Sequence, residues 1–429
     1  MVAAASDILK TGLRRFLRHG LVGNALSLYA VQGLNYLLPL LLFPYLLRVL
    51  GPQGYGSIVF AQALMAYAAI VTDFGFNLTA ARDISVARDD PQAVARIYWT
   101  TMAAKALLLV GCAFVVAIVI LAVPALRHNW EVAVLSGALV IGSAAFPQWY
   151  FQGLERLKEA AAIQAVSKVL YTLCAVLLIR SSGDLLIAAF LMSAQQLFSV
   201  ATAAIMRRRI APEFYRPTFK EVRVALASSR HLFMVQASAT LYGNTNAFVL
   251  GLMNGETAVA IYSLGQRVVA ILQSLSVPVT QALFPRTSLL FSQQPEQAWK
   301  LIGKVAKLIL PAMALACLLV GIFAPQIVAV LGGASYSGAA STLRIMAVVP
   351  LLVTLATMLN QCVMINNGLT GQMVRMYVTV GVLNVLLLPL LIMKLEAGGA
   401  ALSLTIAEGL MAVLLIRMVW TRRKALGWR

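Results

Sequence analysis

The sequence predicts an all-α polytopic membrane protein, with about twelve transmembrane helices in two lobes of six around a central cleft. Three observations support this fold class. The chain of 429 residues is 61% hydrophobic and only 11% charged. Its apolar residues fall in runs of roughly 20, the length of a helix that crosses a bilayer. Most of its 34 Lys and Arg residues lie in every second gap between these runs or at the two ends of the chain.

Each apolar run is expected to form a helix, because backbone polar groups in lipid need partners within the same segment. The runs are also too long for the strands of a membrane barrel. In chain order, the expected spans are 24–48, 57–80, 99–123, 131–151, 161–179, 185–206, 230–252, 258–284, 301–324, 341–364, 374–394 and 398–418.

The cationic gaps predict the orientation. The richest gap lies between 207 and 230, and others follow the second, fourth and eighth spans or lie at the two ends of the chain. By the positive-inside rule, these gaps and both termini face the cytoplasm. The net charge of +19 therefore reflects topology. It does not indicate nucleic-acid binding or a soluble basic domain.

The first six spans, shifted by about 207 residues, fall on the last six, which predicts two lobes of the same orientation related by an axis along the membrane normal. Evenly spaced spans in any polytopic protein are the alternative. The expected organisation is a cytoplasmic amphipathic segment (1–23), an N-terminal lobe (24–206), a cytoplasmic basic linker (207–229), a C-terminal lobe (230–418) and a basic cytoplasmic tail (419–429).

Ionisable residues inside the spans are candidates for function, because they are costly there. Most are cations, which favours a cavity for an anion such as phosphate or pyrophosphate. The candidate binding residues are Arg48, Arg82, Lys105, Lys168 and Arg267. Arg48, Arg82 and Lys105 lie near span ends, so reaching to the interface is their alternative role. The acids Asp73 and Glu408 are candidates for ion coupling, and a structural ion pair is the alternative for Asp73.

Uncharged polar side chains recur at helical spacing within several spans. They would line a hydrated cavity and bind sugar hydroxyls, or else join helices to one another. The candidates for the cavity are Gln32, Asn35, Asn244, Gln266 and Asn360. No cofactor or metal site is expected, because the four cysteines and three histidines are scattered without ligand spacing. The nucleotide-binding motif GxxxxGK[ST] does not occur.

Four motifs resemble a known family. Residues 32–56 read QGLNYLLPLLLFPYLLRVLGPQGYG, and residues 72–85 read TDFGFNLTAARDIS. Residues 146–155 read FPQWYFQGLE, and residues 262–267 read YSLGQR. These strings are similar to Wzx-type oligosaccharide flippases, the polysaccharide-transport branch of the MOP superfamily that also holds MATE exporters and the lipid II flippase. The resemblance covers essentially the whole chain. At position 267, where relatives often carry Lys, this chain has Arg, which keeps the charge.

The resemblance implies a MATE-like fold and a transporter with no enzymatic activity. Its substrate would be an undecaprenyl-pyrophosphate-linked oligosaccharide, moved from the cytoplasmic to the periplasmic leaflet of the bacterial inner membrane. This step serves O-antigen, capsule or exopolysaccharide assembly, by alternating access coupled to an ion gradient. Implied partners are the lipid-linked oligosaccharide, membrane lipids, and the polysaccharide polymerase and chain-length machinery, with no nucleic acid. A MATE-like small-molecule exporter, a lipid II flippase and a non-transporting scaffold are the alternatives.

Overall fold

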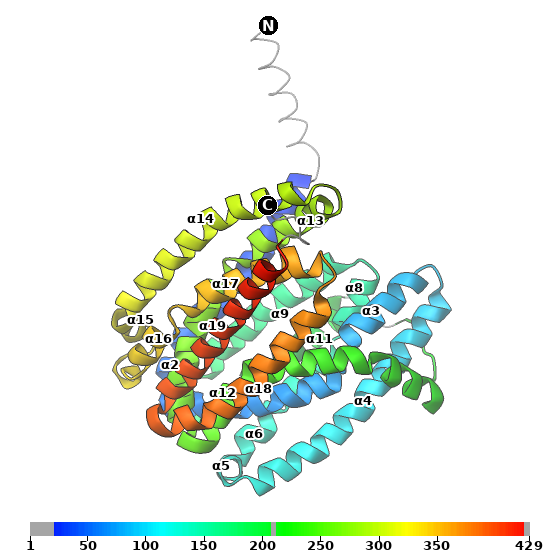
Figure 1. Ribbon diagram of the computed structural model, residues 1–429. Helices are drawn as coiled ribbons and strands as arrows, with labels where there is room; N and C mark the ends of the chain where they lie inside the picture. The colour runs from blue at the N-terminus through cyan, green and yellow to red at the C-terminus, as the bar shows by residue number, and fades with distance from the viewer. Residues whose placement is uncertain (1–20, 207–211, 424–429) are drawn as a thin grey trace, which may run out of the picture.

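The computed structural model describes residues 21–206 and 212–423, without the side chains of 21–37, 39–40, 206, 235 and 238–243. These residues form helices and short turns, with no strand among them (Figure 1). The helices are α2 (Leu21–Asp73), α3 (Phe76–Ala87), α4 (Pro91–Ala122), α5 (Pro124–His128), α6 (Trp130–Ser136), α7 (Ala138–Ala145), α8 (Gln148–Gly153), α9 (Leu157–Leu178), α10 (Leu185–Ser193), α11 (Gln195–Met206), α12 (Phe219–Ser274), α13 (Val277–Gln293), α14 (Pro295–Ile322), α15 (Ala324–Leu331), α16 (Ala339–Met346), α17 (Val349–Leu359), α18 (Thr370–Leu395) and α19 (Ala397–Thr421). Short 3₁₀ turns η1 (Ser182–Asp184) and η2 (Ala334–Tyr336) and a π-helical turn η3 (Asn360–Ile365) complete the described elements.

Many of these helices are long and apolar enough to cross a membrane. The described residues contain nine such helices, or ten when the bent pair α10 and α11 is taken as one broken span. Large apolar side chains such as Val110 and Phe114 of α4 are each 70% exposed, as expected of a surface in contact with lipid. The predicted all-helical membrane fold is confirmed. The number of about twelve spans stays a prediction, with two of the expected spans in α2 and two in α12.

Both of these long helices turn at a glycine. Gly51 in α2 has φ 67° and ψ 176°, and Gly255 in α12 has φ 79° and ψ −172°. Only glycine adopts this backbone conformation without strain. The rings of Phe43 and Tyr55, on either side of Gly51, lie 5.9 Å apart, so the chain folds back on itself there. A glycine turn with similar backbone angles therefore lies between the first two expected spans of each half.

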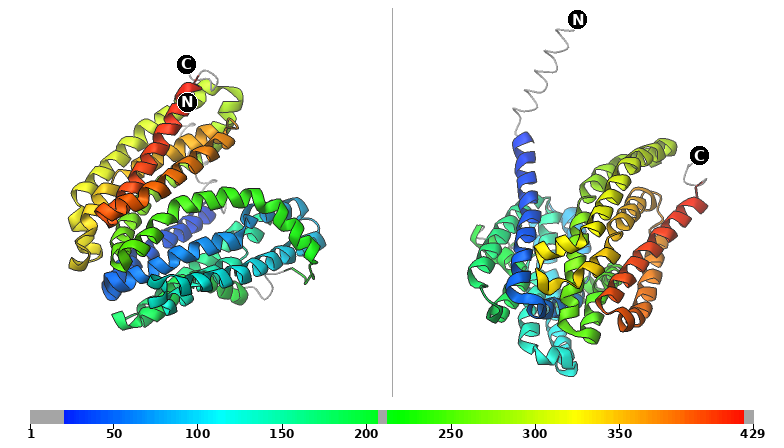
Figure 2. Two further views of the ribbon diagram at one scale, coloured as in Figure 1. Left: turned by 60° about the horizontal axis from the view of Figure 1, so that its bottom comes forward. Right: turned by 90° about the vertical axis from the view of Figure 1, so that its left-hand side faces the viewer.

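The two halves of the molecule meet near these two turns. Gly56 of α2 lies so close to α12 that a Cβ atom added there would stand 1.9 Å from the carbonyl oxygen of Glu256. Phe60 packs in the same way against Gly251. At this end, the helices of the C-terminal half (α14 to α19) and those of the N-terminal half (α2 to α9) come together (Figure 2).

The opposite ends of the two halves diverge. The ends of α13, α14 and α19 point to the top of Figure 1, whereas α3 and α8 lie at its right-hand side. The first part of α12 stays with the N-terminal half. Its Phe233 stacks on Phe74 at 4.5 Å between ring centroids, and its Ser229 lies 2.8 Å from the hydroxyl of Thr79. The diverging ends carry the cationic loops that follow the second, fourth and eighth predicted spans.

Candidate functional site

A cavity of about 180 Å³ lies where α2, α9, α10, α11 and α12 meet. It contains two of the cations selected from the sequence, Lys168 of α9 and Arg267 of α12. We call it the cationic cavity. Its lining residues are Leu42, Phe43, Leu46, Tyr55, Gln62, Lys168, Tyr171, Thr172, Met192, Gln195 and Arg267.

Local structure explains how these side chains converge. Lys168, Tyr171 and Thr172 are spaced three and four residues apart on α9, so they share one face of that helix. The turn at Gly51 brings the first part of α2 opposite Tyr55 and so closes one wall of the cavity. Among the described lining residues, Arg267 alone comes from the C-terminal half of the chain. Movement of α12 against the N-terminal half would therefore change the distance between the two cations.

The electrostatics of the cationic cavity favour an anion. Among the described residues that line it, none is acidic. The guanidinium of Arg267 lies close enough to Lys168 to repel its ammonium group. Neutral donors accompany the cations: Gln62, for example, donates from Nε2 to Ser193 Oγ at 3.0 Å. A phosphate or pyrophosphate placed here would gain charge-assisted hydrogen bonds and would relieve the repulsion.

Lys105 and Asp73 neutralise each other elsewhere in the same lobe. The Lys105 Nζ lies 2.9 Å from Asp73 Oδ1, and the Lys105 side chain is only 1% exposed. Neither residue lines the cationic cavity. The sequence selected Lys105 for substrate binding and Asp73 for ion coupling, with a structural ion pair as the alternative for Asp73. The geometry supports that alternative for both residues.

The other two selected arginines also lie outside the cationic cavity. Arg48 donates from Nη2 to the carbonyl oxygen of Val330 in α15, and so links the two halves of the molecule at the end where they meet. Arg82 is exposed on α3. The structure therefore brings Lys168 and Arg267 together and leaves Arg48, Arg82 and Lys105 at separate places.

The selected uncharged residues do not gather in the cavity either. The side chains of Gln32 and Asn35 lie outside the described part of the chain. Asn244 and Gln266 are half-buried on α12 and are not among the described lining residues. Asn360 is buried in the π-helical turn, where it donates from Nδ2 to the Tyr377 hydroxyl at 2.9 Å.

Glu408 belongs to the same polar region of the C-terminal half. Its carboxylate lies within electrostatic range of the Tyr377 hydroxyl, which accepts the hydrogen bond from Asn360. Short π-helical turns occur often at functional sites. The ion-coupling role of Glu408 stays a prediction. Among the described residues, no group of three or more His, Cys, Asp or Glu side chains could hold a metal ion.

Several residues that line the cationic cavity were not selected as candidates from the sequence. Gln62 and Gln195 are polar residues inside apolar spans, the same signal that selected Gln32 and Asn244. Tyr55 and Tyr171 line the cavity with hydroxyl groups, but tyrosine is common at membrane interfaces and carries no distinct signal there.

Comparison with known proteins identifies the family. A model of the family described as "Polysaccharide biosynthesis protein" matches residues 21–291. A protein of Escherichia coli (strain K12) named "Putative O-antigen transporter" is 28% identical over 407 residues, covering 92% of this chain and 96% of the relative. A protein of the same name from Shigella dysenteriae is 25% identical over 399 residues, covering 92% of this chain and 99% of the relative. Both relatives are named as transporters, in agreement with the prediction that the chain is not an enzyme.

Solved structures show the same fold. An inward-facing MATE family transporter of the MOP superfamily superposes with a TM-score of 0.65 at 14% identity, covering 90% of this chain and 98% of that one. The lipid II flippase MurJ in an inward closed conformation superposes with a TM-score of 0.56 at 13% identity, covering 85% of each chain. The family match and the two O-antigen transporter relatives confirm the resemblance that the motifs indicated, and the solved structures confirm the fold. The chain belongs to the polysaccharide biosynthesis protein family, and its fold is the one shared by MATE transporters and the lipid II flippase.

Proposed function

We propose that this protein is a flippase for undecaprenyl-pyrophosphate-linked oligosaccharides, which it moves from the cytoplasmic to the periplasmic leaflet of the bacterial inner membrane. The observation that carries the proposal is the convergence of Lys168 and Arg267 on one cavity whose described lining contains no acid. Such a cavity fits a pyrophosphate, the charged group that links lipid and glycan in a substrate of this class.

The physical task of a flippase explains why such a cavity is needed. A pyrophosphate with its sugars cannot cross hydrocarbon unaided, because its charges and hydroxyls would lose their hydrogen bonds to water. Lys168 and Arg267 replace the solvation of the phosphates, and Gln62 and Gln195 offer further hydrogen bonds. The polyprenyl tail would stay in the bilayer throughout.

The arrangement of the two halves supports a mechanism of alternating access. The helices diverge at the ends that carry the cationic loops, which the positive-inside rule assigns to the cytoplasm. We therefore assign this conformation to substrate entry from the cytoplasmic leaflet, with both termini on the cytoplasmic side. For release, the contacts at the other end, such as Gly56 against Glu256, would have to separate. An ion gradient would drive the cycle, with Glu408 as the candidate coupling residue.

The experiment is mass spectrometry of polyprenyl-linked lipids from cells with and without this protein. Accumulation of one undecaprenyl-pyrophosphate oligosaccharide on deletion, with loss of the surface polymer, is expected and would identify the glycan. Complementation with K168Q and R267Q, at matched protein levels in the membrane, should fail to restore the polymer. An unchanged lipid pool with an intact surface polymer would overturn the proposal.

The alternatives make different predictions. A small-cation exporter needs negative charge in its cavity, and the described lining of the cationic cavity contains none. An exporter of that kind would alter sensitivity to cationic dyes on deletion. A lipid II flippase would be essential for viability. A membrane scaffold for the polymerase and chain-length machinery would tolerate neutralisation of both cavity cations.

A further inference from the structure

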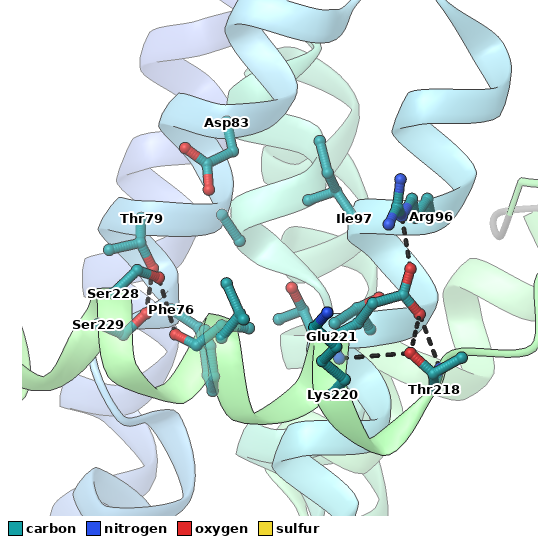
Figure 3. Close-up of a pocket in the computed structure, with 15 residues that line it drawn as sticks. Phe76, Thr79, Asp83, Arg96, Ile97, Thr218, Lys220, Glu221, Ser228 and Ser229 are labelled. Atoms are coloured by element: carbon teal, nitrogen blue, oxygen red, sulfur yellow. Dashed lines mark hydrogen bonds and ion pairs between the residues drawn. The ribbon is translucent and has the colours of Figure 1, made fainter.

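A second pocket lies apart from the cationic cavity, between α3, the first part of α4 and the start of α12 (Figure 3). Its volume is about 640 Å³. We call it the hydroxyl pocket, because six of its lining residues are Ser or Thr. Its lining residues are Phe76, Thr79, Ala80, Asp83, Arg96, Ile97, Thr100, Thr101, Thr218, Lys220, Glu221, Val224, Ala225, Ser228 and Ser229.

Side-chain contacts hold the walls of the hydroxyl pocket together. Arg96 of α4 donates from Nε to Glu221 Oε1 of α12 at 2.6 Å. Glu221 also accepts from the backbone and the hydroxyl of Thr218, which caps the start of α12. On the other side, the hydroxyls of Thr79 and Ser229 lie 2.8 Å apart. Figure 3 shows these contacts around the pocket. The pocket is therefore preformed, as binding sites for small molecules usually are.

One buried hydroxyl in this pocket has no partner. Thr100 is 7% exposed, and among the described residues its Oγ1 has no hydrogen-bond partner. Buried hydroxyls almost always have a partner, so this one needs an explanation. Thr100 lines the pocket but its Oγ1 is enclosed, so rotation of the side chain about its Cα–Cβ bond would present this hydroxyl to a bound ligand with hydroxyl groups.

The charges around the hydroxyl pocket cancel. Arg96 and Lys220 carry positive charge, and Asp83 and Glu221 carry negative charge. Hydrogen bonds from Thr218 and Tyr215 lower the pKa of Glu221 to about 2, so its carboxylate is ionised at neutral pH. An anion would meet as much repulsion as attraction here, unlike in the cationic cavity. A neutral polar ligand, which needs both donors and acceptors, fits better.

We propose that the hydroxyl pocket binds sugar residues of the lipid-linked substrate on the side where it enters. This assignment rests on the proposed function and names a second contact point for the same substrate. Sugar hydroxyls both donate and accept hydrogen bonds, which matches the carboxylate of Asp83, the ammonium of Lys220 and the Thr and Ser hydroxyls. Apolar side chains such as Ile97 and Val224 offer surface for the C–H faces of the rings. The pocket would hold the glycan while the pyrophosphate reaches the cationic cavity.

The test uses the full chain in lipid nanodiscs and neutral monosaccharides (glucose, galactose, N-acetylglucosamine and rhamnose), with binding measured by saturation-transfer NMR. At least one sugar should bind. Thr100→Val should weaken this binding by about tenfold, the loss expected for one hydrogen bond. It should not lower thermal stability, because it removes a buried hydroxyl that has no partner. Asp83→Asn should weaken binding similarly, through loss of a charged acceptor.

The control is Thr280→Val, since Thr280 is also buried and, among the described residues, bonds to carbonyl groups at the start of its own helix. Sugar binding should be unchanged in this variant. Inorganic pyrophosphate serves as the second probe, and its binding should be the same in T100V as in the wild type. Absence of sugar binding to the wild type, or full binding to T100V and D83N, would overturn the assignment.

The two proposals fail in different ways. If deletion causes accumulation of the lipid-linked oligosaccharide but the pocket variants bind sugar normally, only the assignment of the pocket is wrong. If the sugars bind but no lipid-linked oligosaccharide accumulates, the proposed function is wrong, and with it the assignment of this pocket to that substrate.

Discussion

Lys105 and Lys168 lie in the same lobe, on α4 and α9, and have different neighbours. Lys105 is buried against Asp73, with 2.9 Å between Nζ and Oδ1. Lys168 is half-buried and shares a cavity with Arg267. A buried charge is tolerated when an opposite charge neutralises it. Two like charges in one cavity instead favour the binding of an anion. The comparison separates a cation that holds helices together from one that can bind substrate.

The largest expected effect comes from breaking the buried pair. Lys105→Met would leave the Asp73 carboxylate without its partner, and removal of one partner of a buried ion pair costs about 3–5 kcal/mol. We expect a sharp fall in thermal stability and in the amount of folded protein in the membrane, measured by fluorescence-detected size exclusion after heating.

The double variant D73N/K105M is the control for this prediction. It removes both charges, so most of the stability should return, and transport per folded molecule should approach that of the wild type. A single K105M variant that folds normally but loses transport would instead assign Lys105 to the substrate.

The next effect concerns the cationic cavity. Lys168→Gln and Arg267→Gln should each weaken pyrophosphate binding by about 1.5–3 kcal/mol, the range for hydrogen bonds to charged groups. Each change also removes a repulsion between like charges, which offsets part of the stability lost with the contacts of the deleted side chain. Calorimetric titration with inorganic pyrophosphate measures the first effect.

The conservative variant R267K is the matched control for this pair. It keeps the charge but loses the planar group that binds two phosphate oxygens at once, so its binding should fall between wild type and R267Q. Equal pyrophosphate binding in wild type and both glutamine variants would show that the anion binds elsewhere.

The contrast between the two lysines also shows what the sequence could predict. Apolar runs and alternating cationic gaps predicted the all-helical membrane fold. The gaps 49–56 and 253–257 between expected spans predicted that the chain reverses there, but not that each reversal is a tight turn at one residue, Gly51 or Gly255. Glycine is common between spans, and only the observed backbone angles show that these two are required.

The same limit applies to the site. Lys105, Lys168 and Arg267 were selected from the sequence for the same reason, the free-energy cost of a charge inside a membrane. This cost depends on each residue alone, so it does not distinguish the three. Whether a cation has a carboxylate beside it depends on how helices pack. Asp73 lies 32 residues before Lys105, on a different helix. Their spacing in the chain therefore does not predict whether the two side chains meet. Packing, therefore, decided which of the predicted cations form the cavity.

A smaller effect is expected in a buried network of uncharged groups. Ser403 donates from Oγ to Asn384 Oδ1 at 2.7 Å, and Asn384 donates from Nδ2 to Asn246 Oδ1 at 2.9 Å. Ser403→Ala leaves a buried acceptor with one hydrogen bond fewer, which costs about 1–2 kcal/mol. Thermal denaturation of the purified protein measures it. Ser263→Ala is the control, because Ser263 bonds only to a carbonyl of its own helix and should cost less. Equal losses would mean that the network adds nothing to stability.

The smallest effect is expected at the exposed pair of Arg96 and Glu221, which contrasts with the buried pair of Lys105 and Asp73. The Arg96 side chain is 61% exposed, and solvent screens such pairs strongly. Glu221→Gln should therefore change thermal stability far less than K105M.

The pH dependence of this pair follows from the pKa of Glu221. The folded-state pKa of Glu221 is lowered to about 2 from an ordinary value of 4.5, so the contribution of its carboxylate to stability is fully present above pH 4.5 and is lost only as pH falls toward 2. Between pH 5 and 8, wild type and E221Q should then show the same dependence of stability on pH, as measured by thermal denaturation across that range. A difference between them that appears within this range would mean that the folded-state pKa of Glu221 is raised above 4.5, so that its contacts with Thr218 and Tyr215 do not stabilise the ionised carboxylate.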